Sequence, residues 1–221
     1  EQHLREAPVG SKKPFLRYSG GDHWSGANVV DMESPFVGFS LDLRILDIVN
    51  TYLKTCSKSV YFELAMTDPV EPGQAPLLSQ RWHRDPGMKR IVKIFIYLSD
   101  VDEGSGPFTY LLGSHRGGPW RSLYRQRQFG QRGFYPPNEA VDGTVPSDAI
   151  KAFTARRGSV IFADTTGLHK GGYSLSKPRV MHTSVYVAPG DVIKPLFERP
   201  PDFDDKTLSL PEVSRFAISS T

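Results

Sequence analysis

RIVKIFIYL, residues 90–98, is the stretch that most directly predicts the fold of this chain. Its β-branched and aromatic residues are typical of a strand. Alternate residues of a strand point to opposite faces. One face would carry Ile91, Lys93, Phe95 and Tyr97, and the other Val92, Ile94, Ile96 and Leu98. Because the second face is entirely aliphatic, we expect it in the core, whereas the face with the lysine would line the mouth of a barrel.

Similar short runs lie on both sides of this strand. Further strands are predicted at residues 60–66, 79–85, 107–112, 159–164 and 179–188. One helix is predicted at residues 41–54, where apolar residues fall largely on one stripe. Residues 1–40 show no steady period and predict loops and short strands. Many short strands, few helices and no strand–helix alternation predict a mainly β fold, a sandwich or a jelly-roll barrel.

Length and composition are those of an ordinary globular domain. The chain has 221 residues, of which 38% are hydrophobic and 23% charged. We expect one domain, residues 1–221, with its core at about residues 59–190. Residues 113–157 mix glycine, proline, arginine and aromatic residues without a clear period. Long segments of this kind are usually functional, and we interpret this one as an active-site lid; a surface excursion is the alternative.

Charge and cysteine content argue against several classes of protein. The net charge is only +3 and the basic residues are scattered, which predicts no nucleic-acid partner. No apolar run approaches the roughly 18 residues of a membrane span, so we expect no membrane partner and a cytoplasmic location. The single cysteine, Cys56, allows neither an intrachain disulfide nor a thiolate-rich metal site. Any metal would therefore be bound by His, Asp or Glu.

The segment Trp82-His83-Arg84-Asp85 carries the first half of a candidate metal site. On an extended chain, His83 and Asp85 point to the same side and can present an imidazole nitrogen and a carboxylate to one point. Neutral imidazole and carboxylate suit Fe(II), and a second histidine would complete a facial triad with three open positions. A His-x-Asp pair alone is a weak signal, because such residues more often lie exposed or pair with a neighbouring charge.

The second half of the candidate site lies at residues 158–179. A turn and a buried strand at residues 158–164 lead to His169, and Arg179 follows 10 residues later at the start of another strand. This spacing places an imidazole at one strand end and a guanidinium on the next strand. Arginine binds a carboxylate through a bidentate fork. The far carboxylate of 2-oxoglutarate would suit this arginine, while its keto-acid end would chelate the iron.

Three stretches together resemble the phytanoyl-CoA dioxygenase family of 2-oxoglutarate-dependent oxygenases. They are Gln80 to Asp85, Gly106-Pro107-Phe108 through Gly113-Ser114-His115-Arg116, and Gly158 through Arg179. They occur in the order of the family and span about half of the chain. The resemblance implies a double-stranded β-helix, which is a jelly roll. It also implies that His83, Asp85 and His169 bind Fe(II) and that Arg179 binds the C5 carboxylate of 2-oxoglutarate.

The activity that this resemblance implies is that of a dioxygenase. Fe(II), 2-oxoglutarate and O₂ would be required, and a C–H bond of a small-molecule substrate would be hydroxylated with release of succinate and CO₂. Desaturation, epoxidation and ring closure are further outcomes of the same iron chemistry. No residue outside the metal centre is assigned a catalytic role.

The sequence departs from the family pattern at two places. The family often has Ser or Thr two or three residues after the distal histidine, where this chain has Gly171 and Gly172. Another residue would therefore have to assist Arg179. Leu112 replaces the proline that often begins the Pro-Gly-Ser-His loop of the family. Asp85 is retained, which disfavours the related halogenases, since they lack this carboxylate to make room for chloride.

Further contacts to 2-oxoglutarate are predicted for Lys93, Gln80 and Thr183. Thr183 shares a strand face with Arg179 by alternation, so it is the better candidate to support the carboxylate. A lysine at position 93 would face the same barrel mouth and attract an anion. The alternative for Lys93 is a strand-edge residue that reaches water.

Substrate contacts are predicted for Trp82, Arg84 and Tyr97. The predicted lid is rich in arginine, which together with Lys93 favours an acidic or polar substrate; its arginines include Arg121, Arg125, Arg127 and Arg132. His115 is expected to form hydrogen bonds within a turn, and His182 to be a packing or surface residue.

Two other functions stay open on the sequence alone. A cupin-like metal-dependent enzyme would need no 2-oxoglutarate, and the position of Arg179 argues against it. A non-catalytic jelly-roll protein that binds a small molecule would not need to retain all three candidate metal ligands. Succinate formation coupled to loss of 2-oxoglutarate would distinguish the dioxygenase from the cupin-like enzyme. A metal titration would distinguish it from the ligand-binding protein.

Overall fold

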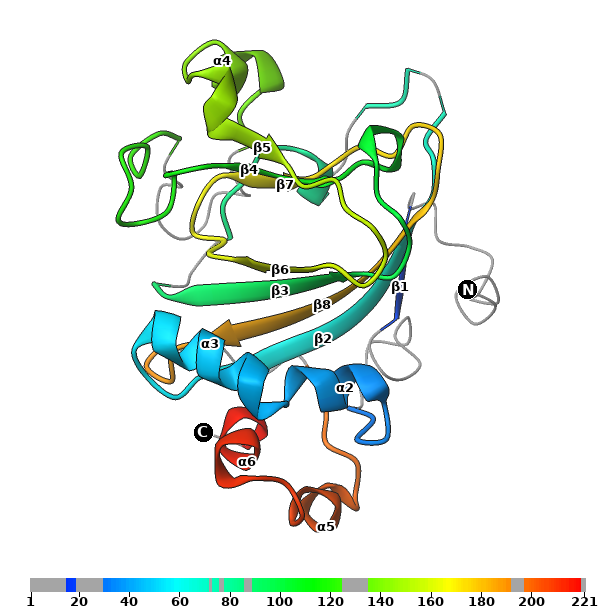
Figure 1. Ribbon diagram of the computed structural model, residues 1–221, viewed down its shortest axis with the longest axis vertical. Coiled ribbons are helices and arrows are strands. Elements are labelled where there is room, and N and C mark those ends of the chain that lie inside the picture. Colours follow the sequence, from blue (N-terminus) through cyan, green and yellow to red (C-terminus); the bar gives the residue numbers. More distant parts are fainter. Residues whose placement is uncertain are drawn as a thin grey trace.

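Two antiparallel β-sheets lie face to face in the computed structural model (Figure 1). The structure describes residues 15–18, 30–71, 73–75, 78–85, 89–124, 135–191 and 197–219. Helices are few and lie outside the pair of sheets. Within these ranges, no helix combines the length and apolar character that crossing a bilayer requires. The predicted mainly β class is therefore confirmed.

The larger sheet has five strands. Their order is β1 (Phe15–Tyr18), β2 (Lys58–Thr67), β8 (Arg179–Val187), β3 (Ile91–Tyr97) and β6 (Val160–Ala163). Each strand is antiparallel to its neighbours. The register pairs Thr67 at the end of β2 with Arg179 at the start of β8. Two residues that are 112 positions apart in the chain therefore meet on one sheet.

The smaller sheet consists of β5 (Ile150–Ala152), β4 (Phe108–Leu111) and β7 (His169–Gly171). His83 adds a single residue to it, because its backbone N–H and C=O exchange hydrogen bonds of 2.9 Å with those of His169. The strand predicted at residues 79–85 is wrong: the 3₁₀ turn η1 (Leu78–Gln80) occupies its start, and among the residues that follow only His83 pairs, as an isolated bridge.

Helices cover the outer face of the larger sheet (Figure 1). The predicted helix at residues 41–54 is confirmed as α3 (Leu43–Leu53). Asp42 caps its start by accepting the N–H of Arg44 at 2.9 Å, and Lys54 ends it in the left-handed region. The remaining helices on this side are α2 (Pro35–Ser40), α5 (Phe203–Thr207) and α6 (Glu212–Ile218).

The main core lies between these helices and the larger sheet. It includes Leu46, Val49, Leu53, Phe62, Val92, Ile94, Tyr186 and Ile218. Val92 and Ile94 confirm that the aliphatic face of β3 is a core face. Phe95, on the opposite face, packs between the sheets with its ring centroid 4.6 Å from that of Phe108. The face of β3 that carries Lys93 therefore points into the space between the two sheets.

The segment 113–157 contains more regular structure than the sequence predicts. β5 lies within it and pairs with β4. Trp120 and Leu123 pack against a cluster that includes Trp82 and Val141 of α4 (Asn138–Asp142). Residues 125–134, with Arg125, Arg127 and Arg132, lie outside the described residues. The function of this segment as a lid stays a prediction.

Candidate metal centre

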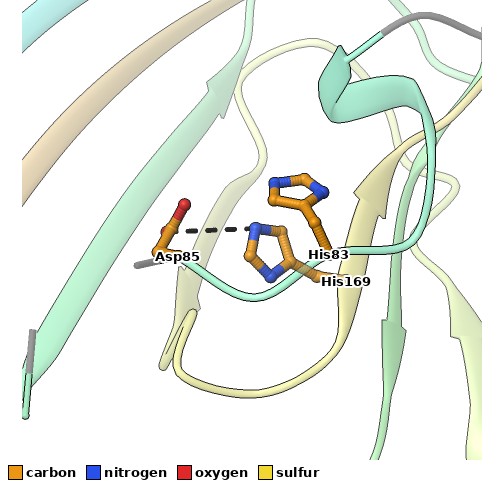
Figure 2. A group of neighbouring side chains, drawn as sticks. All are labelled: His83, Asp85 and His169. Carbon is orange, nitrogen blue, oxygen red and sulfur yellow. Dashed lines mark ion pairs between the residues drawn. The ribbon is translucent and has the colours of Figure 1, made fainter. Parts of the chain in front are cut away.

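Three side chains from two distant parts of the chain converge between the sheets, and Figure 2 shows them facing one another. One ligand atom from each of His83, Asp85 and His169 lies within 4.8 Å of the other two. His83 and Asp85 come from one extended segment, and His169 is the first residue of β7. The distance from Asp85 Oδ2 to His169 Nε2 is 3.9 Å. The structure thus brings together the three residues that the sequence predicts as metal ligands.

Backbone hydrogen bonds hold these residues in place. The two histidines pair through their main chains, as described above, and the N–H of Asp85 donates to Thr165 O at 3.0 Å. The N–H of Leu168, directly before His169, donates to Ser114 Oγ at 2.7 Å. The serine of the Gly-Ser-His turn therefore fixes the loop that leads to the distal histidine.

Both imidazoles are held in the tautomer that a metal requires. Nδ1 of His83 lies 2.8 Å from Arg81 O, and Nδ1 of His169 lies 2.9 Å from Gly167 O. A carbonyl oxygen only accepts, so each Nδ1 carries the proton and donates it. The lone pair is then on Nε2 of each ring. Metal-binding histidines are oriented by the same kind of second hydrogen bond.

Burial keeps the two imidazoles neutral at pH 7. Desolvation lowers the pKa of His169 to about 3, with a further contribution from the nearby His83. Desolvation also lowers the pKa of His83 below its ordinary value. A metal binds neutral imidazole, so neither ring would have to release a proton first.

Asp85 is ionised because of the ammonium group of Lys93. Burial by itself favours the neutral acid, but Lys93 Nζ lies 2.8 Å from Asp85 Oδ2. Its charge outweighs the burial and holds the pKa of Asp85 well below the usual range. Burial likewise opposes the charge of Lys93, but Asp85 outweighs this effect and raises the pKa of Lys93. A cation that approaches Asp85 would therefore meet a carboxylate.

A cavity of about 110 Å³ adjoins the two histidines between the sheets. Its other polar lining residues are Tyr61, Glu63, Thr67, Ser79, Gln80, Lys93, Arg179 and Thr183. Gln80, Lys93, Arg179 and Thr183 thus lie where the sequence predicts them, around one cavity. Their contacts with 2-oxoglutarate stay predictions.

Arg179 is buried in this cavity without a full set of hydrogen bonds. Its side chain is 4% exposed, and Nη2 has only long contacts to Thr67 Oγ1 at 3.5 Å and Gly171 O at 3.4 Å. Among the described residues, Nε and Nη1 of Arg179 find no hydrogen-bond partner. Burial lowers the pKa of Arg179, yet a guanidinium stays charged in proteins. A buried cation with free donors is costly unless an anion binds it.

Thr67 is a lining residue that the sequence does not predict. Its hydroxyl lies 3.5 Å from Nη2 of Arg179, whereas positions 171 and 172, at which the family often has Ser or Thr, are glycines. The sequence does not indicate this contact, because Thr67 lies just beyond the predicted strand 60–66. In addition, the register of β2 against β8 cannot be read from either strand alone.

A larger hollow of about 300 Å³ lies elsewhere, beside α3, and is mainly apolar. It shares Phe108 with the cavity of the triad but includes none of the three candidate ligands. Tyr52 and Asp164 lie on its wall, joined by a hydrogen bond of 2.6 Å. The two histidines of the triad and Arg179 therefore line the smaller cavity and not the larger hollow.

The model of one protein family matches residues 34–181, more than half of the chain, and its description is phytanoyl-CoA dioxygenase (PhyH). This chain belongs to the phytanoyl-CoA dioxygenase family. The match includes all three residues of the triad and Arg179. The resemblance seen in the sequence motifs is therefore confirmed.

Relatives within and around the phytanoyl-CoA dioxygenase family agree with this assignment. The ectoine dioxygenase of Bordetella parapertussis is 27% identical over 125 residues, which cover 52% of this chain and 41% of that protein. The match thus spans less than half of the length of that relative. The crystal structure of EctD from S. alaskensis with bound Fe has a TM-score of 0.56 at 18% identity, covering 90% of this chain and 66% of that chain.

A second solved structure is that of the epimerase SnoN in complex with Fe³⁺, alpha ketoglutarate and nogalamycin RO. It has a TM-score of 0.55 at 15% identity and covers 84% of this chain and 74% of that chain. At such identities, the likeness to both structures concerns the fold.

Two of the predicted substrate contacts are instead core residues of this member of the phytanoyl-CoA dioxygenase family. Trp82 is fully buried and packs in the cluster outside the smaller sheet, with Lys170 Nζ 4.7 Å from its ring. Tyr97 is also fully buried, and its hydroxyl donates to Phe153 O at 2.9 Å and accepts the N–H of Phe108 at 3.1 Å. Alternation explains Trp82, because it points opposite to His83.

Arg84, the third predicted substrate contact, also points away from the cavity. It alternates with His83 and Asp85, so its side chain lies on the other side of the segment. There it donates four hydrogen bonds to backbone carbonyl groups and is 7% exposed. The prediction that Arg84 contacts the substrate is therefore wrong.

His182 and His115 lie outside the triad. His182 packs on the helix side of β8, stacked on the ring of Phe36 at 5.0 Å, with Nε2 3.1 Å from Ser40 Oγ. The prediction of a packing role for His182 is confirmed. His115 follows Ser114 in a turn and lines the larger hollow.

Proposed function

We propose that this protein is an Fe(II)- and 2-oxoglutarate-dependent dioxygenase that hydroxylates a C–H bond of a small molecule. The observation that carries the proposal is a His-Asp-His triad whose two histidines line one cavity together with a buried, incompletely bonded arginine. Membership of the phytanoyl-CoA dioxygenase family supports it. The order and antiparallel pairing of the strands support a double-stranded β-helix, or jelly roll, as the fold.

The donor set of the triad fits Fe(II). His83 and His169 would each supply Nε2, and Asp85 a carboxylate oxygen, which is the composition of the 2-His-1-carboxylate centres of non-haem iron oxygenases. The neutral rings and the ionised carboxylate are already in the protonation states that a metal needs. Bound iron would supply, with O₂ and 2-oxoglutarate, the oxidising power for hydroxylation with release of succinate and CO₂.

The cavity offers two positive charges to a dicarboxylate. Arg179 would bind the far carboxylate of 2-oxoglutarate through the donors that lack a partner among the described residues. Thr67 and Thr183 would add hydroxyl groups, and Lys93 and Gln80 would contact the co-substrate on the side of the triad. Of these two charges, that of Lys93 is already paired with Asp85 at 2.8 Å, so Arg179 would compensate the far carboxylate and the bound metal the keto-acid end.

Aromatic side chains would limit the access of water to the reacting centre. Phe95 and Phe108 pack on each other in the cavity wall, and the ring of Phe108 lies 5.8 Å from that of His169. Excluding water strengthens electrostatic contacts inside a site and prevents side reactions. Related proteins have been solved with 5-hydroxyectoine and with hygromycin B, which supports a small-molecule substrate for this protein too.

The proposal is tested by titration calorimetry followed by a turnover assay. Wild-type protein should bind Mn(II), used in place of Fe(II), and the Mn(II)-loaded protein should then bind 2-oxoglutarate. With Fe(II), ascorbate and O₂, succinate should form at the rate at which 2-oxoglutarate disappears. His83→Ala and Asp85→Ala should abolish Mn(II) binding and turnover, whereas His115→Ala, outside the triad, should behave as wild type.

Each alternative function has its own outcome in this experiment. Binding of Mn(II) without binding of 2-oxoglutarate would replace the proposal with a cupin-like enzyme that does not use this co-substrate. Failure of Mn(II) to bind to the wild-type protein would favour a non-catalytic ligand-binding protein.

A further inference from the structure

Arg84 lies between two of the three candidate metal ligands but faces the opposite side of the segment. It is 7% exposed, so its charge is almost fully removed from water. Burial of a guanidinium is costly unless its donors are satisfied. The contacts of Arg84 therefore indicate what this charge is used for.

Four backbone carbonyl groups accept hydrogen bonds from Arg84. Nη1 donates to Ser114 O and to Thr166 O, each at 2.6 Å. Nη2 donates to Leu123 O at 2.8 Å and to Trp120 O at 3.2 Å. Two loops that are distant in the sequence thus meet on one planar group. Arginine has the fixed fork of donors that this task requires, whereas lysine has a single nitrogen.

The bond to Thr166 connects Arg84 with the third ligand. Thr166 lies between Thr165, whose carbonyl accepts the N–H of Asp85 at 3.0 Å, and Gly167, whose carbonyl lies 2.9 Å from Nδ1 of His169. Arg84 therefore holds the loop at the residue between the acceptors that orient these two ligands. Its own chain neighbours are His83 and Asp85.

We propose that Arg84 is a positioning residue that fixes the distal histidine relative to the segment that carries the other two metal ligands. The inference rests on the proposed metal centre. Without the guanidinium, the extended segment and the loop 164–168 would lose this link, and buried carbonyl groups would lose a donor. Ligand supports of this kind typically change metal affinity by about 10–100-fold when they are removed.

The test measures Co(II) binding without co-substrate or substrate. Co(II) is titrated into the wild-type protein and into Arg84→Met, Arg84→Lys and Arg199→Met, and both the affinity and the visible absorption of bound Co(II) are recorded. Arg199→Met is the matched control, because Arg199 also donates to a backbone carbonyl, Ile218 O at 2.9 Å, but lies beside the outer helices. Thermal unfolding of each metal-free variant reports its stability.

We expect Arg84→Met to weaken Co(II) binding about 10–100-fold and to change the absorption of the bound ion. Arg84→Lys, which keeps the charge but reaches fewer carbonyl groups, should lie between Arg84→Met and the wild type. Arg199→Met should keep the wild-type affinity and spectrum. If Arg84→Met does not fold, Arg84→Lys against Arg199→Met decides the question by the same two measurements.

Two results would overturn the inference while the metal centre stands. One is wild-type affinity and spectrum in the Arg84 variants. The other is an equal loss of affinity in Arg199→Met, which would make the effect a consequence of general destabilisation. If the wild-type protein itself does not bind Co(II), the metal centre is refuted, and the role of Arg84 with it.

Discussion

Arg179 is the residue on which binding of the co-substrate is expected to depend most. Hydrogen bonds to charged groups contribute about 1.5–3 kcal/mol, and 1.4 kcal/mol corresponds to a factor of ten. Arg179→Ala should therefore raise the KM for 2-oxoglutarate by about 10–100-fold and leave the Kd for Mn(II) unchanged. Steady-state kinetics and calorimetry check the two values. An unchanged KM would contradict the assignment of this residue.

The stability of a variant at Arg179 shows whether a loss of activity comes from weaker co-substrate binding or from a loss of fold. Arg179 is buried with two nitrogens that lack partners among the described residues, so it destabilises the protein when no anion is bound. Arg179→Met, measured without 2-oxoglutarate, should unfold at the same temperature as the wild type or at a higher one. A loss of activity in this variant is then not a loss of fold.

Gly171 and Gly172 occupy the positions at which the family often has Ser or Thr, but the two sites differ in the space they offer. A Cβ at Gly171 would lie 3.7 Å from Nη2 of Arg179, in ordinary contact. A Cβ at Gly172 would lie 2.3–2.4 Å from backbone atoms of Gly106 and Pro107, which cannot move easily. Gly171→Ser should fold normally and lower the KM for 2-oxoglutarate by up to about tenfold, because one hydrogen bond adds about 1 kcal/mol.

Gly172→Ser is the matched counterpart and should lower the free energy of unfolding by about 1–3 kcal/mol. Urea unfolding of both variants, together with kinetics on Gly171→Ser, checks the pair. Equal stability of the two variants would show that the close approach at Gly172 is not a constraint.

The β6–β7 loop is the element that sets the position of the distal ligand. A Cβ at Gly167 would lie 1.9 Å from the hydroxyl of Tyr110 and 2.8 Å from Ser114 Oγ. Ser114 Oγ accepts the N–H of Leu168, so a shift there would move His169. Gly167→Ala should cost about 1–3 kcal/mol of stability and weaken Mn(II) binding.

Gly38→Ala is the control for this change, because it lies in α2 and its Cβ would meet nothing within 4 Å. It should leave Mn(II) binding unchanged and leave the stability unchanged or increase it by up to about 1 kcal/mol. Calorimetry with Mn(II) and urea unfolding measure both variants. Normal Mn(II) affinity in Gly167→Ala would show that the loop does not position the ligand.

At the scale of elements, the sequence predicts long strands better than short ones. β3 and β8 contain seven and nine residues and carry clear β-type runs. β5 and β7 have three residues each, which is too few for alternation to be recognised. The extended chain at His83 and Asp85 lies beside His169, as the sequence predicts, although it forms a bridge and not a full strand.

At the scale of the whole molecule, the sequence predicts those parts of the candidate site that depend only on which side of one extended segment a side chain lies. Alternation places His83 and Asp85 on one side and Lys93 in the space between the sheets. The same alternation directs Trp82 and Arg84 away from the cavity, which is why neither can contact a substrate there. The ion pair of Lys93 with Asp85 and the contact of Thr67 with Arg179 depend on the register between strands and sheets, which the sequence does not reveal.

The pH dependence of stability is a property of the whole fold that follows from its buried histidines. The pKa of an imidazole in the unfolded chain is near 6.5, whereas burial lowers the pKa of His182 to about 4 and that of His169 to about 3. Well above pH 6.5, both rings are neutral in both states and contribute nothing to the pH dependence. Between about pH 6.5 and 4, the unfolded chain binds protons that the folded protein does not, so stability falls as the pH is lowered.

Removing one of these rings should reduce that slope in the metal-free protein. His182→Phe keeps an aromatic ring against Phe36, and Ser40 Oγ retains its hydrogen bond to Phe36 O at 2.7 Å. Each proton contributes about 1.4 kcal/mol per pH unit, so His182→Phe should flatten the fall in the free energy of unfolding by up to that amount. Urea unfolding between pH 4.5 and 7 (about the range in which both rings matter) with EDTA present measures the slope. An equal slope in wild type and variant would mean that His182 is protonated as readily in the folded protein as in the unfolded chain.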